Sequence, residues 1–222
     1  MVNKNRALVV MSGGQDSTTC LGVALRDNSY VEAVSFNYGQ KHAIELEVAA
    51  TICKKVAVPL TVIDVPALQK MTSSALVNGG DVNAEHAYLE GRPASFVPAR
   101  NALFLTMAFG IAMERGLNLL YTGVCQTDYS GYPDCRDIFI KTLNTALRVG
   151  YETDIHILTP LMDLTKAQTF KLAEEVGVLD LVLEHSHTCY NGSRTPNDWG
   201  KGCGECGACK LRARGYEEYL RG

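Results

Sequence analysis

The feature that most constrains the fold is a short apolar run near the start, followed directly by a glycine-rich turn and a helical pattern. Residues 7–11, ALVVM, form an unbroken apolar segment, which is typical of a strand buried on both faces of a sheet. Residues 12–17, SGGQDS, supply the turn, and apolar side chains at Leu21, Ala24 and Leu25 then recur with helical spacing. This order of strand, turn and helix predicts the first unit of an α/β fold.

The same alternation continues along the chain. Further buried strands are expected over residues 31–36, 60–65, 119–123 and 155–158. Amphipathic helices are expected over residues 42–56, 101–115, 137–149, 166–176 and 208–220. Strands that alternate with helices indicate a parallel sheet covered on both faces, so the predicted fold is a Rossmann-like α/β domain. The long polar connection over residues 78–98 is typical of a lid or a flexible segment.

The composition limits the size, the partners and the compartment of the protein. At 222 residues, 46% of them hydrophobic and 20% charged, the chain suits one globular domain with a small appendage. A net charge of −3 gives no electrostatic basis for nonspecific binding to nucleic acid or to a membrane surface. The apolar run at residues 7–11 is too short for a signal peptide, and no segment reaches the ~20 apolar residues of a membrane span. A cytoplasmic protein that binds neither nucleic acid nor a membrane is therefore expected.

The glycine-rich turn has the composition of a phosphate-binding loop. Two adjacent glycines let backbone N–H groups close around phosphate oxygens, and the N-terminus of the following helix adds partial positive charge. Ser12 and Ser17 add hydroxyl donors, and Asp16 is suited to hold a Mg²⁺ ion that bridges phosphates. The sequence lacks the Gly-Lys-Ser/Thr ending of a P-loop and the G-x-G-x-x-G of a dinucleotide fold. The alternative is a tight turn in which Asp16 or Ser17 only caps the helix.

Four of the eight cysteines gather near the end of the chain, at Cys189, Cys203, Cys206 and Cys209. Two-residue spacers let a tight turn present successive thiolates, and four thiolates suit a closed, tetrahedral zinc site. Disulfides are disfavoured by the expected compartment, and a redox pair is disfavoured by the third closely spaced cysteine. An iron–sulfur cluster is the stronger rival, because cysteine count alone does not exclude it. A structural Zn²⁺ site is expected in a C-terminal region over residues 184–222, after a catalytic domain over residues 1–183.

The S-G-G-x-D-S turn after a first strand resembles the PP-loop of the ATP pyrophosphatase superfamily. The resemblance implies that ATP is cleaved between its α and β phosphates and that an oxygen of the substrate is adenylated. It also implies that the adenine ring lies by the end of the second strand, near Phe36 and Tyr38. The ATP-binding residues expected on this basis are Val10, Met11, Ser12, Gly13, Gly14, Gln15, Asp16, Ser17, Thr18, Thr19, Cys20, Phe36 and Tyr38.

Four further stretches, together with this loop and the cysteine cluster, resemble the 7-cyano-7-deazaguanine synthase (QueC) family along essentially the whole chain. They are YGQKH at residues 38–42, FVPARN at 96–101, GVCQTDYSGYPDCR at 123–136 and TCYNG at 188–192. The resemblance implies that ATP adenylates the carboxylate of 7-carboxy-7-deazaguanine and that ammonia then displaces AMP to give an amide. A second ATP would activate the amide oxygen, and loss of AMP would leave the nitrile. A role in queuosine biosynthesis and a homodimer are also implied.

The implied chemistry gives roles to particular residues. Asp16, Arg100 and Lys166 are the expected catalytic residues: Asp16 holds Mg²⁺, Arg100 binds the substrate carboxylate or developing phosphate charge, and Lys166 binds phosphate. The expected substrate-binding residues are Gln40, His42, Arg100, Asn101, Gln126, Asp128, Tyr129, Tyr132, Asp134 and Arg136. Acceptors and aromatic rings in this set suit the N1–H, the amino group and the flat ring of a deazaguanine. The alternatives are that Tyr129 and Tyr132 only pack and that Lys166 is a solvated first-turn residue.

Three departures from the family pattern bear on the chemistry. Ala99 stands where the family normally has Gly, Gln126 stands where it normally has Glu, and extra residues follow Asn191. A Glu at position 126 would accept from the guanine-like edge with full charge, so the first two departures concern substrate choice and the second chemical step. The rival functions are an enzyme that stops at the amide or uses a related deazapurine, and a PP-loop tRNA-modifying enzyme. A zinc-ribbon binding module on a degenerate nucleotide fold is the rival from another class.

Overall fold

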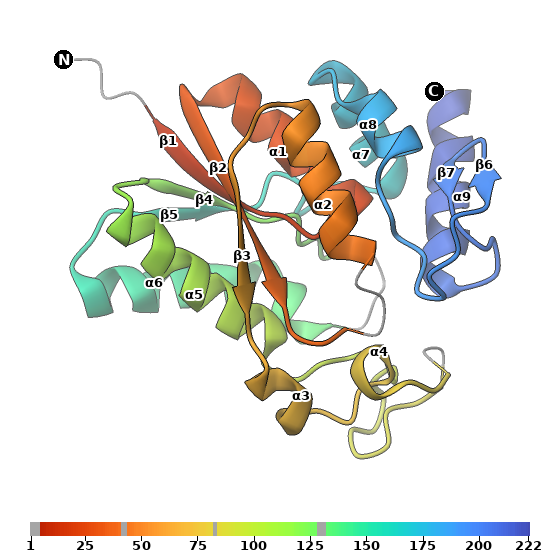
Figure 1. Ribbon diagram of the computed structural model, residues 1–222, viewed down its shortest axis with the longest axis horizontal. Helices are drawn as coiled ribbons and strands as arrows, with labels where there is room; N and C mark the ends of the chain where they lie inside the picture. Colours follow the sequence, from red (N-terminus) through yellow and green to blue (C-terminus); the bar gives the residue numbers. More distant parts are fainter. Residues whose placement is uncertain (1–4, 41–43, 82–83, 128–131) are drawn as a thin grey trace.

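The computed structural model of the protein describes residues 5–40, 44–81, 84–127 and 132–222. Its centre is a sheet of five parallel strands in the order β3-β2-β1-β4-β5 (Figure 1). The strands are β1 (Arg6–Val10), β2 (Tyr30–Asn37), β3 (Leu60–Asp64), β4 (Leu119–Tyr121) and β5 (His156–Leu158). The five predicted strands and the parallel α/β fold are confirmed, with strand ends that differ from the predicted ranges by one or two residues.

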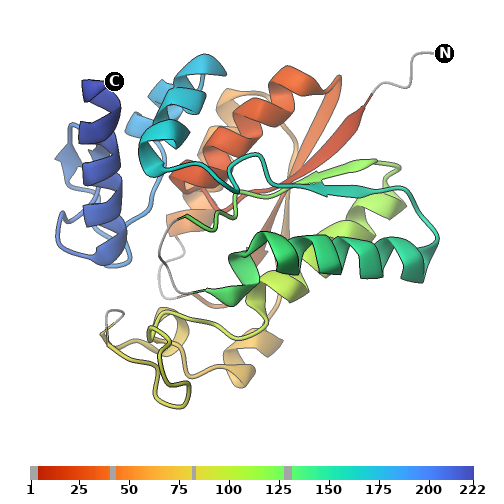
Figure 2. The same ribbon diagram turned by 180° about the vertical axis from the view of Figure 1, so that it is seen from behind.

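Helices cover both faces of this sheet, as Figures 1 and 2 show. One face carries α1 (Gln15–Asp27), α2 (Ile44–Lys55), α7 (Lys166–Glu175) and α8 (Leu179–Glu184). The other face carries α5 (Arg100–Glu114) and α6 (Asp137–Tyr151). Among the described residues, no helix is both long enough and apolar enough to cross a membrane.

The strand order places the glycine-rich turn at the point where ligands bind in folds of this kind. The chain moves outward from β1 through β2 to β3 and then returns to the other side of β1 with β4. In open α/β sheets, ligands bind beyond the carboxyl ends of the strands at such a reversal. The turn between β1 and α1 lies there, so the fold supports the prediction of a phosphate loop.

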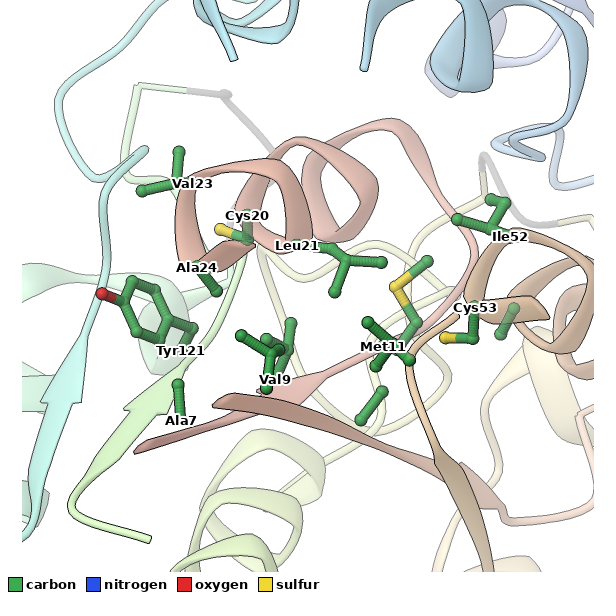
Figure 3. Close-up of a cluster of buried hydrophobic side chains, with 14 of the residues drawn as sticks. Ala7, Val9, Met11, Cys20, Leu21, Val23, Ala24, Ile52, Cys53 and Tyr121 are labelled. Carbon is green, nitrogen blue, oxygen red and sulfur yellow. The ribbon is translucent and has the colours of Figure 1, made fainter. Parts of the chain in front are cut away.

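The alternation of side chains along β1 explains why an unbroken apolar run is needed. Ala7 and Val9 point toward α1 and belong to the same core cluster as Leu21, which Figure 3 shows. Leu8 points to the opposite face and belongs to a second cluster with Phe109 of α5. Because successive side chains of a strand point to opposite faces, both sets must be apolar in a strand that helices cover on both sides.

Several short elements are missing from the sequence-based prediction. They are α3 (Ala67–Met71), α4 (Ala75–Asn78), the 3₁₀ turn η1 (Pro133–Cys135), α8, and a hairpin of β6 (Pro196–Asn197) and β7 (Gly200–Lys201). Elements of this length are too short to display a helical or strand periodicity. The connection expected over residues 78–98 contains an isolated antiparallel bridge between Glu85 and Pro93.

The C-terminal helix α9 (Gly207–Arg221) packs along α7. The ring centroid of Phe170 in α7 lies 5.1 Å from that of Tyr216 and 5.9 Å from that of Tyr219. The guanidinium of Arg212 is fully buried and donates hydrogen bonds to Val182 O, Ser186 Oγ, Thr188 Oγ1 and Trp199 O. These contacts join α9 to the rest of the chain. The predicted domain boundary between residues 183 and 184 stays a prediction.

Candidate active site and metal centre

The turn between β1 and α1 has the backbone geometry of an anion-binding loop. Gly13 has a φ of +80°, and a Cβ at this position would lie 2.8 Å from the carbonyl oxygen of Glu45 in α2. Only glycine permits this close approach of the loop to α2. Helix α1 begins at Gln15 with Gly14 as its N-cap and without a side-chain cap. The first N–H groups of α1 are therefore left for a ligand.

Hydrogen bonds to two serine hydroxyls stabilise the conformation of this loop. The hydroxyl oxygens of Ser12 and Ser17 are 3.1 Å apart, and the Ser17 hydroxyl donates to the carbonyl of Gly14 at 3.2 Å. The N–H of Ser12 in turn donates to Ser17 Oγ at 3.3 Å. Asp16 and Ser17 both lie inside the first turn of α1 and neither caps it. The alternative that they only cap the helix is therefore wrong.

Asp16 forms an ion pair with Lys166. The Nζ atom of Lys166 lies 2.8 and 2.7 Å from the two carboxylate oxygens of Asp16. Lys166 is the first residue of α7, whose N-terminus is fixed by a capping box between Thr165 and Gln168. A lysine in the first turn opposes the helix dipole, and this one is 8% exposed, so it is not a solvated surface residue. The pair places one positive and one negative charge beside the loop.

A cavity of about 350 Å³ adjoins the loop, within the size range of small-molecule sites. Its wall includes the carboxyl ends of β1, β2 and β4, the start of α5, and residues 187–190. The predicted ATP-binding residues that line it are Val10, Met11, Ser12, Gly14, Gln15, Asp16, Ser17, Phe36 and Tyr38. The others are buried and do not line it: Gly13, Thr18, Thr19 and Cys20.

Apart from Gln126, the predicted substrate-binding residues fall into three groups. Those that line the cavity are Gln40, Arg100, Asn101 and Tyr132, which come from separate parts of the chain. Asp134 accepts a hydrogen bond from the N–H of Asn101 at 3.3 Å, and Arg136 is exposed as the N-cap of α6. His42, Asp128 and Tyr129 lie outside the described residues.

The side chain of Gln126 forms its hydrogen bonds outside the cavity. Its amide nitrogen donates to the Asp163 carboxylate at 2.7 Å, and its amide oxygen accepts from the N–H of Asp137 at 3.2 Å. The side chain is exposed and is not among the cavity-lining residues. A glutamate could not donate to Asp163, so this arrangement suits an amide. This arrangement does not support the predicted contact of Gln126 with the substrate. That contact stays a prediction.

Arg100 supplies positive charge inside the cavity. Burial disfavours its charged form, but the neighbouring Tyr38, Tyr132 and Asp134 groups outweigh burial and raise the pKa of Arg100 above its ordinary value. The rings of Phe36 and Phe104 are stacked beside it in the cavity wall, with centroids 4.4 Å apart. Flat apolar surfaces near a fixed guanidinium suit a planar ligand that carries negative charge.

The polar residues of the cavity wall that the sequence does not predict include Glu45 and Tyr190. Burial raises the pKa of Glu45 from 4.5 to about 7, and the charge of Arg100 opposes that shift. Burial also raises the pKa of Tyr190, and Tyr132 adds to the effect. Tyr190 lies in the TCYNG stretch, which is the signal that points to it. Glu45 lies in the first turn of α2, where an acidic residue ordinarily complements the helix dipole, so no sequence pattern marks it.

The four clustered cysteines meet in space. Their Sγ atoms all lie within 4.8 Å of one another, and those of Cys203 and Cys209 are 3.9 Å apart. Ligands at the ~2.3 Å Zn–S distance of a tetrahedral site lie about 3.8 Å apart, so this donor set fits one metal ion. The N–H groups of Glu205 and Cys206 lie 3.4 and 3.3 Å from the Cys203 sulfur and favour its thiolate form. Cys189 also lines the cavity, so the metal-binding group adjoins the candidate active site.

Comparison with known proteins identifies the family. The model of the family described as queuosine biosynthesis protein QueC matches residues 6–220. The chain belongs to the QueC family. A 7-cyano-7-deazaguanine synthase of Clostridium acetobutylicum is 49% identical over 220 residues, which cover 99% of this chain and 97% of that protein. The synthase of Wolinella succinogenes is 49% identical over 221 residues, with coverage of 98% and 95%.

Solved structures of two other proteins have a similar fold. A 4-thiouridine synthetase in complex with RNA and ATP superposes with a TM-score of 0.52 at 18% identity, covering 97% of this chain and 53% of that one. The U34-tRNA thiolase NcsA of Methanococcus maripaludis, with its 4Fe-4S cluster, gives a TM-score of 0.53 at 16% identity, with coverage of 99% and 66%. The QueC chain thus spans about half and about two thirds of these proteins. At these identities the likeness shows a shared fold.

Proposed function

We propose that the protein converts 7-carboxy-7-deazaguanine and ammonia into 7-cyano-7-deazaguanine for queuosine biosynthesis, with release of AMP and pyrophosphate. The observation that carries this proposal is the Asp16–Lys166 pair beside the phosphate loop, in a cavity that Arg100 also lines. The arrangement joins an ATP-cleaving loop to a pocket suited to a planar anion. Relatives that are 49% identical are named 7-cyano-7-deazaguanine synthase.

The loop and the ion pair account for adenylation. The N–H groups at the start of α1 and the hydroxyls of Ser12 and Ser17 bind phosphate oxygens. The bonds from Lys166 to Asp16 keep its ammonium group beside the loop, where it stabilises the charge that develops on the leaving pyrophosphate. Asp16 offers the carboxylate for Mg²⁺, which when bound screens the phosphates from the incoming substrate oxygen. Phe36 lines the cavity at the end of β2, where the adenine ring would lie.

Arg100 and the aromatic wall account for the positioning of the substrate. The guanidinium binds the substrate carboxylate and holds one oxygen toward the α-phosphate of ATP. Ammonia then displaces AMP, and the amide oxygen is adenylated in the same pocket before the nitrile forms. An acyl-adenylate hydrolyses readily, so the cavity must exclude water during these steps. Apolar side chains of Leu76, Phe104 and Leu211 in its wall support this requirement.

The departures at Ala99 and Gln126 give no support to an enzyme that stops at the amide. Ala99 has a φ of +62°, the left-handed conformation that a glycine would adopt as the N-cap of α5. Gln126 bonds to Asp163 and to the N–H of Asp137, outside the cavity. Neither departure changes a group that lines the cavity, so the proposal keeps the nitrile as the product.

We further propose Zn²⁺ as the metal of the four-cysteine group and Mg²⁺ as the ion that accompanies ATP. The sulfur spacing favours one ion over an iron–sulfur cluster, which places several atoms between the thiolates. Four thiolates fill a tetrahedral coordination sphere, so the proposed role of Zn²⁺ is structural. Free ammonia as the nitrogen donor, a homodimer and a cytoplasmic location complete the proposal on the basis of the family resemblance.

The products of ATP cleavage test this function. With 7-carboxy-7-deazaguanine, Mg²⁺ and ammonium, the protein is expected to release AMP and pyrophosphate. Asp16→Asn is expected to lower the rate by ~100-fold or more, because a charged group of the site is lost. Asp180→Asn changes an exposed aspartate in the first turn of α8 and is the matched control, with activity retained. Release of ADP and phosphate, or ATP cleavage that does not depend on the deazaguanine, would contradict the proposal.

A further inference from the structure

The cavity contains a carboxylate that the proposed adenylation does not use. Glu45 lies in the first turn of α2, whose backbone contacts the phosphate loop at Gly13. Glu45 lines the cavity, and its carboxylate forms no hydrogen bond or ion pair with another residue in the part of the chain that the structure describes. Glu45 is half-buried, and a partly desolvated carboxylate without a partner costs free energy, so such groups gather where a ligand uses them.

The groups that face Glu45 form one polar and aromatic part of the cavity. The positive charge of Arg100, at the start of α5, lowers the pKa of Glu45. The negative charge of Glu45 in turn raises the pKa of Tyr38, which follows the end of β2. Tyr132 raises the pKa of both Arg100 and Tyr190. All five residues line the same cavity. A negative group, a positive group and aromatic rings are thus presented together to a ligand.

This set of groups matches the chemistry of a deazaguanine that carries a carboxylate. The ring presents two neighbouring donors, N1–H and the exocyclic amine, on one edge, and its anionic substituent lies elsewhere. A carboxylate accepts two adjacent donors with its two oxygens, whereas an amide has a single acceptor oxygen. Arg100 is suited to the anionic substituent, and that leaves the donor edge for Glu45. The triphosphate of ATP is an unsuitable ligand for Glu45, because like charges repel.

We propose that the Glu45 carboxylate accepts hydrogen bonds from the N1–H and the exocyclic amine of the substrate, and so selects a 2-amino ring. This inference rests on the proposed function, because it takes the deazaguanine as the ligand. It gives Glu45 the recognition role that the sequence suggests for position 126. Glu45 acts as a specificity-determining residue, while Asp16, Lys166 and Arg100 serve the chemical steps.

Two variants of α2 test the inference. Glu45→Gln leaves one acceptor and turns an N–H toward a donor of the ring, so the Kd for 7-carboxy-7-deazaguanine should rise about 10- to 100-fold. The Kd for ATP should change by less than about twofold. Glu47→Gln changes an exposed glutamate in the same turn and should bind both ligands like the unmodified protein. Calorimetry in the presence of a non-hydrolysable ATP analogue gives these constants.

A second ligand separates recognition from acid–base chemistry. The unmodified protein should bind the analogue that lacks the exocyclic amine ~10-fold more weakly than the substrate, and Glu45→Gln should bind the two alike. Equal discrimination by both proteins would overturn the inference. A lower kcat with unchanged Kd values would also overturn it, and would make Glu45 a proton acceptor for the ammonia step. An unmodified protein that binds no 7-carboxy-7-deazaguanine would overturn the proposed function itself, so the two failures are distinguishable.

Discussion

At the scale of single residues, Glu45 shows how a binding group can lower the stability of the fold that holds it. Burial raises its pKa from 4.5 to about 7, so the folded protein binds more protons than the unfolded chain between these values. The free energy of unfolding therefore falls as the pH rises through this window and stays lower above pH 7. The protein is therefore less stable because of a residue that is proposed to contact the substrate, a trade-off common in binding sites.

Glu45→Gln is accordingly expected to raise thermal stability at pH 8 while it weakens substrate binding. At ~1.4 kcal/mol per pKa unit, the gain at pH 8 is at most a few kcal/mol, and it shrinks as the pH falls toward 4.5. Thermal unfolding of Glu45→Gln, Glu47→Gln and the unmodified protein at pH 8 and pH 5 measures the effect. A Tm difference that is the same at both pH values would show that the carboxylate is not desolvated.

Ala99 carries backbone strain at the start of α5. Its φ of +62° costs a residue with a Cβ about 1–2 kcal/mol relative to glycine. The greater freedom of glycine in the unfolded chain offsets part of this, so Ala99→Gly should stabilise the protein by about 1 kcal/mol. Urea denaturation measures the change, with an unchanged slope and unchanged ATP cleavage expected. A loss of stability would contradict the left-handed conformation at this position.

The residues of the site differ in how far the sequence reveals them. Asp16 and Ser17 belong to one contiguous motif, whose chemistry can be read from residue types and spacing alone. Lys166 and Arg100 are recognised through family resemblance, because only the fold brings them to the loop. Glu45 escapes both routes, since its desolvation depends on tertiary packing around an ordinary first helical turn.

At the scale of elements, the packing of α9 on α7 determines where Lys166 lies. Gly215 of α9 faces the start of α7, and a Cβ there would lie 2.3 Å from the Cβ of Lys166. The two helices therefore approach closely at the point where Lys166 turns toward Asp16. The terminal helix thus contributes to the geometry of the phosphate site, although α9 itself contributes only Ala208 and Leu211 to the cavity wall.

Gly215→Ala is expected to displace Lys166. The added methyl group should destabilise the protein by about 1–3 kcal/mol through overpacking and should lower kcat for ATP cleavage. Gly150→Ala is the matched control: Gly150 also lies in a helix, but a Cβ there meets no atom within 4 Å. The control should gain up to ~1 kcal/mol of stability from helix propensity and keep its activity. Equal stability and equal kcat of the two variants would show that α9 does not constrain the position of Lys166.

The elements that the sequence predicts are the strands of the parallel sheet, which appear as apolar runs, and the longer helices, which show a helical period. The five strands and helices such as α5 and α6 fall within a few residues of their predicted ranges. The short helices α3, α4 and α8 give no periodic signal, and the β6–β7 hairpin has two residues per strand. The packing of α9 on α7 also depends on contacts between segments that no local pattern encodes.

At the scale of the whole molecule, the cysteine cluster and the phosphate loop are parts of one structure. The N–H of His187 donates to the carbonyl of Gly13 at 2.9 Å, and His187 lies two positions before Cys189 of the cysteine cluster. Arg212 of α9, buried between the cluster and α8, bonds to Ser186 and Thr188 in the same segment. Loss of the metal is therefore expected to disturb the wall of the cavity as well as the C-terminal region.

Metal analysis tests this link. The purified protein is expected to carry about one Zn²⁺ per chain, and Cys203→Ser should lose the metal, lower the Tm and reduce ATP cleavage, because ligation free energy contributes to folding. Elemental analysis and unfolding curves on the two proteins provide the readouts. Iron in place of zinc, or a Cys203→Ser protein that loses the metal yet keeps its Tm and activity, would contradict the account.

Formation of the nitrile at the expense of two ATP molecules is the central claim, and mass spectrometry of the products tests it most directly. The reaction would contain 7-carboxy-7-deazaguanine, ATP, Mg²⁺ and ammonium labelled with nitrogen-15. The account predicts 7-cyano-7-deazaguanine with the label in its nitrile group and two AMP released for each nitrile formed. A labelled amide as the final product, with one AMP for each amide, would contradict it.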